Sequence, residues 1–384
     1  MKRNYWLKQL VCTCLMVLIG CTCIAQNTKA EMRIDSIMKV YKMVGLSVAV
    51  VKKGDLIYTH SFGLKNIATN TPLTNDNIFR IASISKSFSA TAIMQLVEAK
   101  KLSLNDDVSN LIGFTVRNPK FPDKIITLKM LMSHTSSLND SQGYFTLDSI
   151  NPAKTPNWAK CYSDYAPGAG YAYCNLNYNM VGTIIERVSG ERFDKYIKAH
   201  ILDKLGLYGG YEVGALDSTK FATLYEYDSA AQKFMAADGA YNPRTAEINN
   251  YVMGYSASIF SPTGGMKISA ADLARYMTMH AYYGKYKGTR IISKKSAKTM
   301  QTPVSGGEGG YGLAIMTANN TIIPGEVMKG HTGSAYGLYS MMFFHPKKKF
   351  GIVAITNGCE VSYDSGFNPA LKAVENVLYE EIIK

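Results

Sequence analysis

The stretch FRIASISKSFSATAIMQLV, residues 79–97, is the part of the chain around which the remaining segments are best interpreted. It holds Ser83 and Lys86 in the pattern Ser-x-x-Lys, followed by apolar residues at helical spacing. If a helix begins at Ser83, the hydroxyl and ammonium groups lie on one face, because residues three apart are neighbours there. A serine needs a nearby base or cation to become a nucleophile. Alone, the pattern is more typical of a helix N-cap followed by a surface lysine, so the other segments must decide.

The segments on both sides of this stretch predict one sheet built from the two ends of the chain. Apolar runs over 46–51 and 56–62 flank a Lys-Gly-Asp turn and predict an antiparallel hairpin. Three more strands are predicted at 311–316, 339–344 and 350–356. The middle of the chain is mainly helical, with a strongly periodic run over 177–189 that ends at Gly190. The other predicted helices are 30–43, 193–205, 269–282, 293–300 and 369–383.

This order of elements predicts an α/β (α+β) fold with two parts. An antiparallel sheet, assembled from the N- and C-terminal segments and flanked by helices, would carry an inserted, mainly helical domain. We place the sheet domain at residues 30–113 and 256–384 and the inserted domain at residues 114–255. The cleft between two such domains is where a site is expected.

The first 25 residues have the character of a secretory signal peptide. A basic start precedes the apolar run 10–19, which is too short for a comfortable membrane span. Cleavage before Gln26 competes with a lipobox-like Leu-Ile-Gly-Cys sequence that would make Cys21 a lipid anchor. We therefore expect an exported protein, periplasmic or lipid-anchored to a bacterial envelope, and Cys21 is the membrane attachment that the sequence suggests. Downstream, only Cys161, Cys174 and Cys359 remain, so a disulfide framework is not expected.

The charge pattern argues against nucleic acid as a partner. The formal net charge is +13, from 42 Lys and Arg against 29 Asp and Glu. The lysines are scattered in short pairs and one triplet, whereas nucleic-acid binding favours a concentrated basic stripe. No histidine pair has metal-ligand spacing, and no cofactor is predicted. A small molecule or peptide is the expected partner.

Two further polar motifs follow in the chain. Tyr173 and Asn175 form Tyr-x-Asn on a Gly-rich turn before the 177–189 helix. The sequence Gly-His-Thr-Gly-Ser over 330–334 is expected just ahead of a strand, where its two glycines would let a substrate lie against the backbone. Each motif has a plain structural alternative: Tyr173 as packing, Asn175 as an N-cap, and His331 as a loop histidine.

With these three motifs in order, the chain resembles the serine β-lactamase and penicillin-binding-protein family, specifically its class C branch. That branch includes class C β-lactamases, D-alanyl-D-alanine carboxypeptidases, D-aminopeptidases and related esterases. The family motifs are Ser-x-x-Lys, Tyr-x-Asn and Lys/His-Thr/Ser-Gly, and the flanking stretches LMSHTSSL and SAADLARY are also similar. The third motif departs from class C β-lactamases, because His331 stands where they carry lysine. This histidine form is the one seen in carboxypeptidase and esterase relatives.

The resemblance implies a role for each motif residue. Ser83 would form an acyl-enzyme, and Lys86 or Tyr173 would be the general base, with the Lys86 cation lowering the pKa of Tyr173. Asn175 would bind the substrate's amide or carbonyl, and a cationic or donating His331 would hold a carboxylate or polarise Tyr173. The Ser83 and Ser334 backbone N–H groups would form the oxyanion hole, and Thr332, Gly333 and Ser334 of the third motif would bind the substrate.

The implied function is an exported serine hydrolase acting on a D-amino-acid peptide, an ester or a β-lactam. Peptidase or esterase activity ranks above true β-lactamase activity because of His331. Two alternatives stay open: an acyltransferase that passes the acyl group to an acceptor other than water, and a penicillin-binding or sensing module without turnover.

Overall fold

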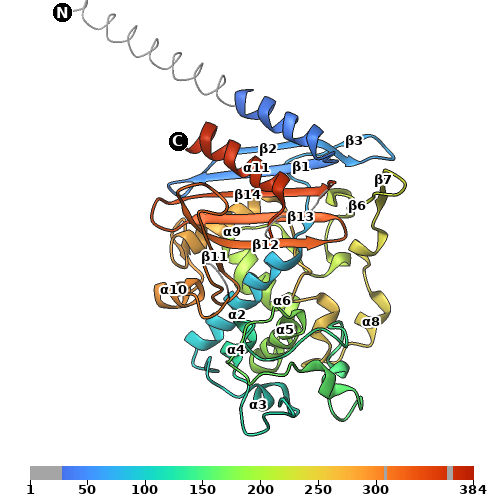
Figure 1. The fold of residues 1–384 in the computed structure, drawn as a ribbon, viewed down its shortest axis with the longest axis vertical. Coiled ribbons are helices and arrows are strands. Elements are labelled where there is room, and N and C mark those ends of the chain that lie inside the picture. The colour runs from blue at the N-terminus through green and yellow to red at the C-terminus, as the bar shows by residue number, and fades with distance from the viewer. Residues whose placement is uncertain (1–27, 307–308, 361–365) are drawn as a thin grey trace, which may run out of the picture.

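A seven-stranded antiparallel sheet forms the upper half of the molecule in Figure 1. The computed structural model describes residues 28–306, 309–360 and 366–384, so the predicted leader and Cys21 lie outside the described residues. The strands follow the order β11-β12-β13-β14-β1-β2-β3, and β14 pairs with β1. The prediction of one antiparallel sheet from both ends of the chain is thereby confirmed. The strands are β1 (Gly45–Lys52), β2 (Asp55–Asn66), β3 (Thr71–Pro72), β11 (Met316–Asn319), β12 (Val327–Ala335), β13 (Leu338–His345) and β14 (Phe350–Gly358).

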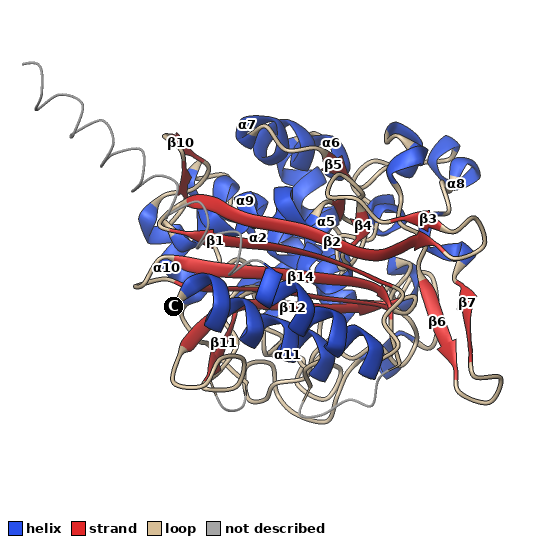
Figure 2. Ribbon diagram, turned by 90° about the horizontal axis from the view of Figure 1, so that it is seen from above, coloured by secondary structure: helices blue, strands red, loops and turns tan. Residues whose placement is uncertain are grey.

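Helices cover both faces of this sheet, as Figures 1 and 2 show. The helix over residues 28–40 and α11 (Pro369–Leu378), which a π-helical turn Tyr379–Ile383 extends, pack on one face. The other face packs against α9 (Ala270–Ala281). Neighbouring residues of β1 face different cores: Val50 packs in the core with the helix over residues 28–40 and α11, and Ala49 packs in the core with α9. This alternation is the period of two that a strand covered on both faces requires.

The remaining helices gather below the sheet in Figure 1, around the long helices α2 (Ser85–Glu98) and α5 (Asn175–Ser189). The division into domains at residues 113/114 and 255/256 stays a prediction. The shorter helices are α3 (Val108–Ile112), α4 (Leu128–Met132), α6 (Phe193–Ile197), α7 (Asp203–Leu205), α8 (Thr245–Asn249) and α10 (Lys294–Gln301). The short strands are β4 (Phe79–Arg80), β5 (Gly209–Gly210), β6 (Tyr225–Asp228), β7 (Lys233–Ala236), β8 (Lys267–Ile268), β9 (Lys285–Tyr286) and β10 (Thr289–Arg290).

Two predicted elements differ from the structure. The strand expected over 311–316 does not form, because Ala314 takes a left-handed backbone with φ of 60° that turns the chain, and β11 begins only at Met316. Tyr311 forms only isolated bridges, with Ser305 and Met316. The segment 330–334 lies inside β12 rather than ahead of a strand. The predicted ends of α5 and α9 are confirmed: Gly190 caps α5 in the left-handed region, and the Ser269 side chain caps α9.

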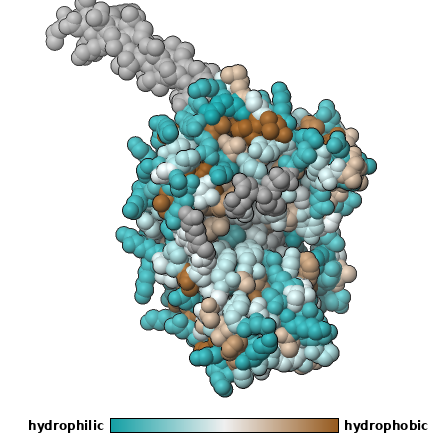
Figure 3. All heavy atoms as spheres, in the orientation of Figure 1, coloured by the Kyte–Doolittle hydropathy of each residue, from teal (hydrophilic) through white to brown (hydrophobic). Residues whose placement is uncertain are grey.

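Disulfides and membrane spans can be checked on the described residues. There, Cys161, Cys174 and Cys359 are buried free thiols that form no disulfide. No helix of the described ranges combines the length and apolar character needed to cross a bilayer. The face shown in Figure 3 is largely hydrophilic. Export and anchoring at Cys21 stay predictions.

Candidate active site

Ser83 lies on a strained turn that leads into α2. The turn is a short 3₁₀ helix, Ala82–Ile84, and Ala82 has a left-handed φ of 50°. That conformation costs an L-residue roughly 1–2 kcal/mol, so the surroundings must hold it. The Ser85 hydroxyl donates to the Ala82 carbonyl oxygen at 2.6 Å and accepts from the Met266 N–H at 3.0 Å. Ser83 is therefore presented by a turn that its neighbours fix in place. It lies two residues before α2 begins at Ser85, whereas the sequence predicts a helix that begins at Ser83.

Lys86 lies beneath Ser83 and is fully buried. Its Nζ donates to Ser83 Oγ at 3.0 Å, to Asn175 Oδ1 at 2.9 Å and to the Thr263 carbonyl oxygen at 3.0 Å. Burial disfavours the charged ammonium and lowers the pKa of Lys86 from 10.5 to about 7, although the Asp140 carboxylate acts in the opposite sense. Near neutral pH a large share of Lys86 is therefore an uncharged amine whose lone pair can face Ser83.

Tyr173 lies on the other side of the Ser83 hydroxyl. Its ring is 4.8 Å from Lys86 Nζ and packs on His134, with 4.3 Å between ring centroids. Its side chain is 41% exposed to the cleft. Partial removal from water raises the pKa of Tyr173, and the hydrogen bond with Ser83 opposes that rise. The expectation that the Lys86 cation lowers this pKa is therefore wrong, because removal of the Tyr173 hydroxyl from water is the largest effect and it raises the pKa.

Asn175 links Lys86 to a carboxylate that the sequence analysis missed. Its Oδ1 accepts from Lys86 and from Thr263 Oγ1, while its Nδ2 donates to Asp140 Oδ2 at 3.0 Å. The backbone N–H groups of Asn175 and Leu176 also donate to Asp140. Asp140 therefore caps the positive end of α5. The alternative in which Asn175 is only a helix N-cap is wrong, because α5 begins at Asn175 and Cys174 is the N-cap residue. No sequence motif marks Asp140, because it lies in a loop 35 residues before Asn175.

Of the two forms expected for His331, a cation or a hydrogen-bond donor, the cation is excluded. Its side chain is 3% exposed, its Nδ1–H donates to the Thr332 carbonyl oxygen at 2.6 Å, and its Nε2 accepts from the Tyr311 hydroxyl at 2.9 Å. Burial, and next the nearby Lys86, lower the pKa of His331 to about 3. Both ring nitrogens are occupied by protein groups and the ring is neutral. Holding a substrate carboxylate by charge is therefore excluded for His331. Tyr311, its donor, is a second residue that the sequence analysis missed.

The glycines of β12 make room for the protein's own chain. A Cβ at Gly333 would lie 2.3 Å from the Ile81 carbonyl oxygen, and one at Gly330 would lie 1.9 Å from the Met342 carbonyl oxygen. Since real Cβ contacts do not come so close, Gly333 lets β12 pack directly against the turn that carries Ser83. The explanation that these glycines admit a substrate is replaced by this one.

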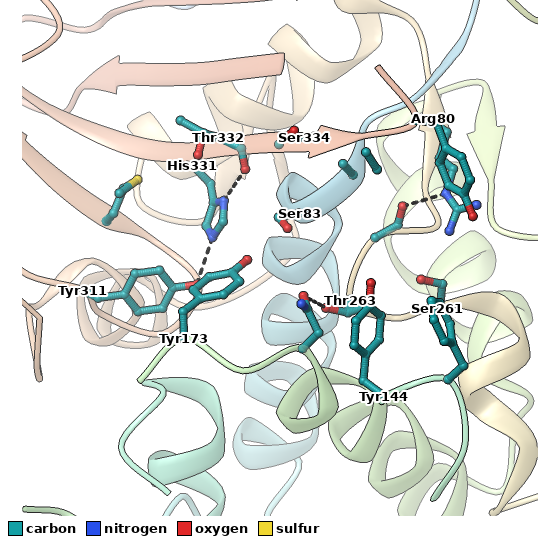
Figure 4. A pocket seen from close by; sticks show the side chains of 18 of the residues that line it. Arg80, Ser83, Tyr144, Tyr173, Ser261, Thr263, Tyr311, His331, Thr332 and Ser334 are labelled. Atoms are coloured by element: carbon teal, nitrogen blue, oxygen red, sulfur yellow. Dashed lines mark hydrogen bonds between the residues drawn. The ribbon is translucent and has the colours of Figure 1, made fainter. Parts of the chain in front are cut away.

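A cleft of about 670 Å³ opens above Ser83. All the predicted site residues except Lys86 line it, and Figure 4 shows Tyr173, Tyr311 and His331 on one side of Ser83, with Arg80 and Tyr144 on the other. β11 pairs only with Val327–Gly330 of β12, so the following residues, His331 to Ser334, border the cleft. Such an edge can bind an extended substrate through backbone groups. Within the described ranges, no three His, Cys, Asp or Glu side chains gather as a metal site.

Comparisons with known proteins agree with this geometry. The family model described as "Beta-lactamase" matches residues 30–368. The chain is 28% identical over 342 residues to penicillin-binding protein 4 of Amycolatopsis lactamdurans, which covers 85% of this chain and 84% of that protein.

Two solved structures have the same fold. The octameric penicillin-binding protein homologue from Pyrococcus abyssi has a TM-score of 0.73 and 28% identity, over 93% of this chain and 77% of that chain. The D-amino acid amidase from Ochrobactrum anthropi SV3 has a TM-score of 0.70 at 21% identity, over 94% and 99% of the two chains. With a family model that spans most of its length, the chain belongs to the β-lactamase family, the superfamily of serine β-lactamases and penicillin-binding proteins.

Proposed function

We propose that this protein is an exported serine hydrolase that acts on an amide or ester through an acyl-enzyme at Ser83. One observation carries the proposal: Lys86 Nζ lies 3.0 Å from Ser83 Oγ, and its pKa is lowered to about 7. A general base is most effective when its pKa lies near the working pH. Nucleophile and base are thus within hydrogen-bond distance, at the floor of a cleft with a strand edge beside it.

The mechanism follows from the protonation states. Uncharged Lys86 accepts the Ser83 proton as Ser83 Oγ forms a bond to the substrate carbonyl carbon. The resulting oxyanion would be stabilised by the backbone N–H groups of Ser83 and Ser334. When the bond to the leaving group breaks, the leaving atom takes a proton from the Tyr173 hydroxyl, and protonated Lys86 returns a proton to Tyr173. Water then attacks the acyl-enzyme by the reverse sequence.

For Tyr173→Phe we expect acylation to slow by at least about 100-fold, the usual range for lost acid–base catalysis. The phenyl ring preserves the packing against His134, so the loss isolates the hydroxyl group. Stopped-flow release of the leaving group, at matched thermal stability, measures the effect. Unchanged acylation rates would remove Tyr173 from the mechanism.

Amide or ester substrates rank above β-lactams for an electrostatic reason. β-Lactam antibiotics carry a carboxylate, and His331, at the position where class C β-lactamases have lysine, is neutral here. Among the solved structures with this fold is one named a D-amino acid amidase, which supports the ranking by fold only. A penicillin-binding module without turnover is the second candidate, favoured by the relative named penicillin-binding protein 4.

A substrate panel separates these functions. Purified protein is incubated with nitrocefin, p-nitrophenyl esters and D-Ala-D-Ala peptides, with and without an added alcohol or amine acceptor. Steady turnover of esters or peptides supports the hydrolase, and products carrying the acceptor support an acyltransferase. A single stoichiometric burst without turnover supports the penicillin-binding module. Absence of any covalent intermediate with every substrate would refute all three.

A further inference from the structure

A second hollow continues the active-site cleft past the turn between β12 and β13. Its volume is about 710 Å³, and Glu226, Ser334 and Tyr336 line both it and the cleft above Ser83. Four tyrosines face it, together with the two carboxylates Glu226 and Glu360; the tyrosines are Tyr41, Tyr227, Tyr336 and Tyr339. A substrate longer than the catalytic cleft would therefore pass Glu226 before it enters the second hollow.

Glu226 differs from Glu360 in having no counter-ion. Glu360 is paired with Lys42 at 2.7 Å. Glu226 is exposed, and among the residues that the structure describes no cation lies within ion-pair distance of its carboxylate. The chain has a formal net charge of +13, so an unpaired carboxylate beside the active site is opposite in sign to the net charge of the chain. A carboxylate among aromatic rings is the chemistry that binds an alkylammonium group.

The position of Glu226 is fixed by its neighbour in β6. Tyr225 is buried, and its hydroxyl accepts from the Ile67 N–H at 2.8 Å. Its carbonyl oxygen lies against the two-residue turn of Tyr336 and Gly337, where a Cβ on Gly337 would approach it to 1.9 Å. Since side chains alternate along a strand, burial of Tyr225 leaves Glu226 directed away from the core. The packing of Tyr225 thus holds Glu226 where the two hollows meet.

The side of the cleft on which Glu226 lies identifies the part of the substrate it meets. Tyr173 donates the proton to the leaving group in the proposed mechanism, so the leaving group occupies the Tyr173 and His331 side of Ser83 (Figure 4). The opposite side carries Arg80, whose guanidinium stacks on Tyr336 at 4.8 Å. Tyr336 adjoins Glu226 in both hollows. Glu226 therefore lies on the side of the acyl group.

We propose that Glu226 is a specificity residue that binds an ammonium group on the acyl part of the substrate. The preferred substrates would be amides or esters whose acyl portion extends past Tyr336 and ends in a primary amine. This inference rests on the proposed acyl-enzyme function and names the substrate class of the same site.

The test compares two substrates that differ only in that charge. D-Alanyl p-nitroanilide is acylated with 6-aminohexanoyl or with hexanoyl, and kcat/KM is measured for the wild type and for Glu226→Gln. We expect the wild type to prefer the amine by about five- to tenfold, mainly through KM, since exposed ion pairs and cation–π contacts are modest. Glu226→Gln should remove the preference and leave the hexanoyl substrate unchanged within about twofold. Because the pair is exposed, 0.5 M NaCl should also reduce the preference.

Asp35→Asn is the matched control, because it removes one exposed carboxylate that lines neither hollow. It should retain the preference. Equal losses on both substrates in Glu226→Gln, or a preference that Asp35→Asn also removes, would overturn the assignment. A wild type that hydrolyses both substrates equally would overturn it while leaving the acyl-enzyme function standing. A wild type that hydrolyses neither, nor any substrate of the earlier panel, would count against the proposed function itself.

Discussion

Replacing Ser83 with alanine is expected to abolish covalent labelling and to lower kcat/KM by at least about 10⁴-fold, since loss of a nucleophile removes the acyl-enzyme route entirely. The labelling probe is a fluorescent penicillin or a fluorophosphonate, and intact-protein mass spectrometry gives the stoichiometry. Lys86 keeps its hydrogen bonds to Asn175 and Thr263 in this variant, so the fold should persist.

Ser87→Ala is the matched control for this experiment. Ser87 lies on the same helix, is fully buried, and donates its hydroxyl to the Ile84 carbonyl oxygen at 2.7 Å. Its loss should cost about 1 kcal/mol of stability, typical of one hydrogen bond, and should leave labelling intact. A Ser83→Ala protein that still forms the adduct, or a Ser87→Ala protein that folds but does not, would refute the assignment of the nucleophile.

The second large effect concerns pH. We expect kcat/KM to rise with pH through an apparent pKa near 7 and to level off above it, because Lys86 must be uncharged to accept the Ser83 proton. A change in kcat/KM centred near pH 7 is usually assigned to a histidine. Here His331 has a pKa of about 3 and is already neutral throughout that range. The pKa of Tyr173 is raised, so its hydroxyl stays protonated at the pH values of the plateau.

Two variants separate these groups. Lys86→Met should lower kcat/KM by at least about 100-fold and remove the acid limb, whereas His331→Asn should keep the midpoint near 7 even if activity falls. Stability supplies a second measurement. Between pH 7 and 10.5 the unfolded chain holds a proton on Lys86 that the native protein lacks, so the wild type should gain stability as pH rises through this window. In Lys86→Met, the free energy of unfolding should no longer rise with pH in this window for this reason. A midpoint that moves with His331→Asn would contradict the assignment to Lys86.

Much of the fold could be read from local patterns. The β1–β2 hairpin, the Gly190 cap of α5 and the Ser269 cap of α9 each depend on residues close in sequence, where period and capping chemistry are visible. The strand predicted over 311–316 shows the limit. Its residue pattern is strand-like, but a left-handed Ala314 turns the chain and places Tyr311 beside His331. That partner lies 20 residues away, and no local pattern records it.

The sequence alone determined which groups can react: a serine with a lysine one turn later, a tyrosine and asparagine pair, and a His-Thr-Gly motif. Their charge states and partners were decided only by the tertiary structure. A pKa depends on burial and on neighbours from distant segments. Burial among distant segments lowers the pKa of Lys86, Tyr311 occupies the nitrogen of His331 that a substrate would need, and Asp140 orients Asn175. The tertiary structure likewise packs β6 against the turn of Tyr336 and Gly337, which places Glu226 beside the active-site cleft.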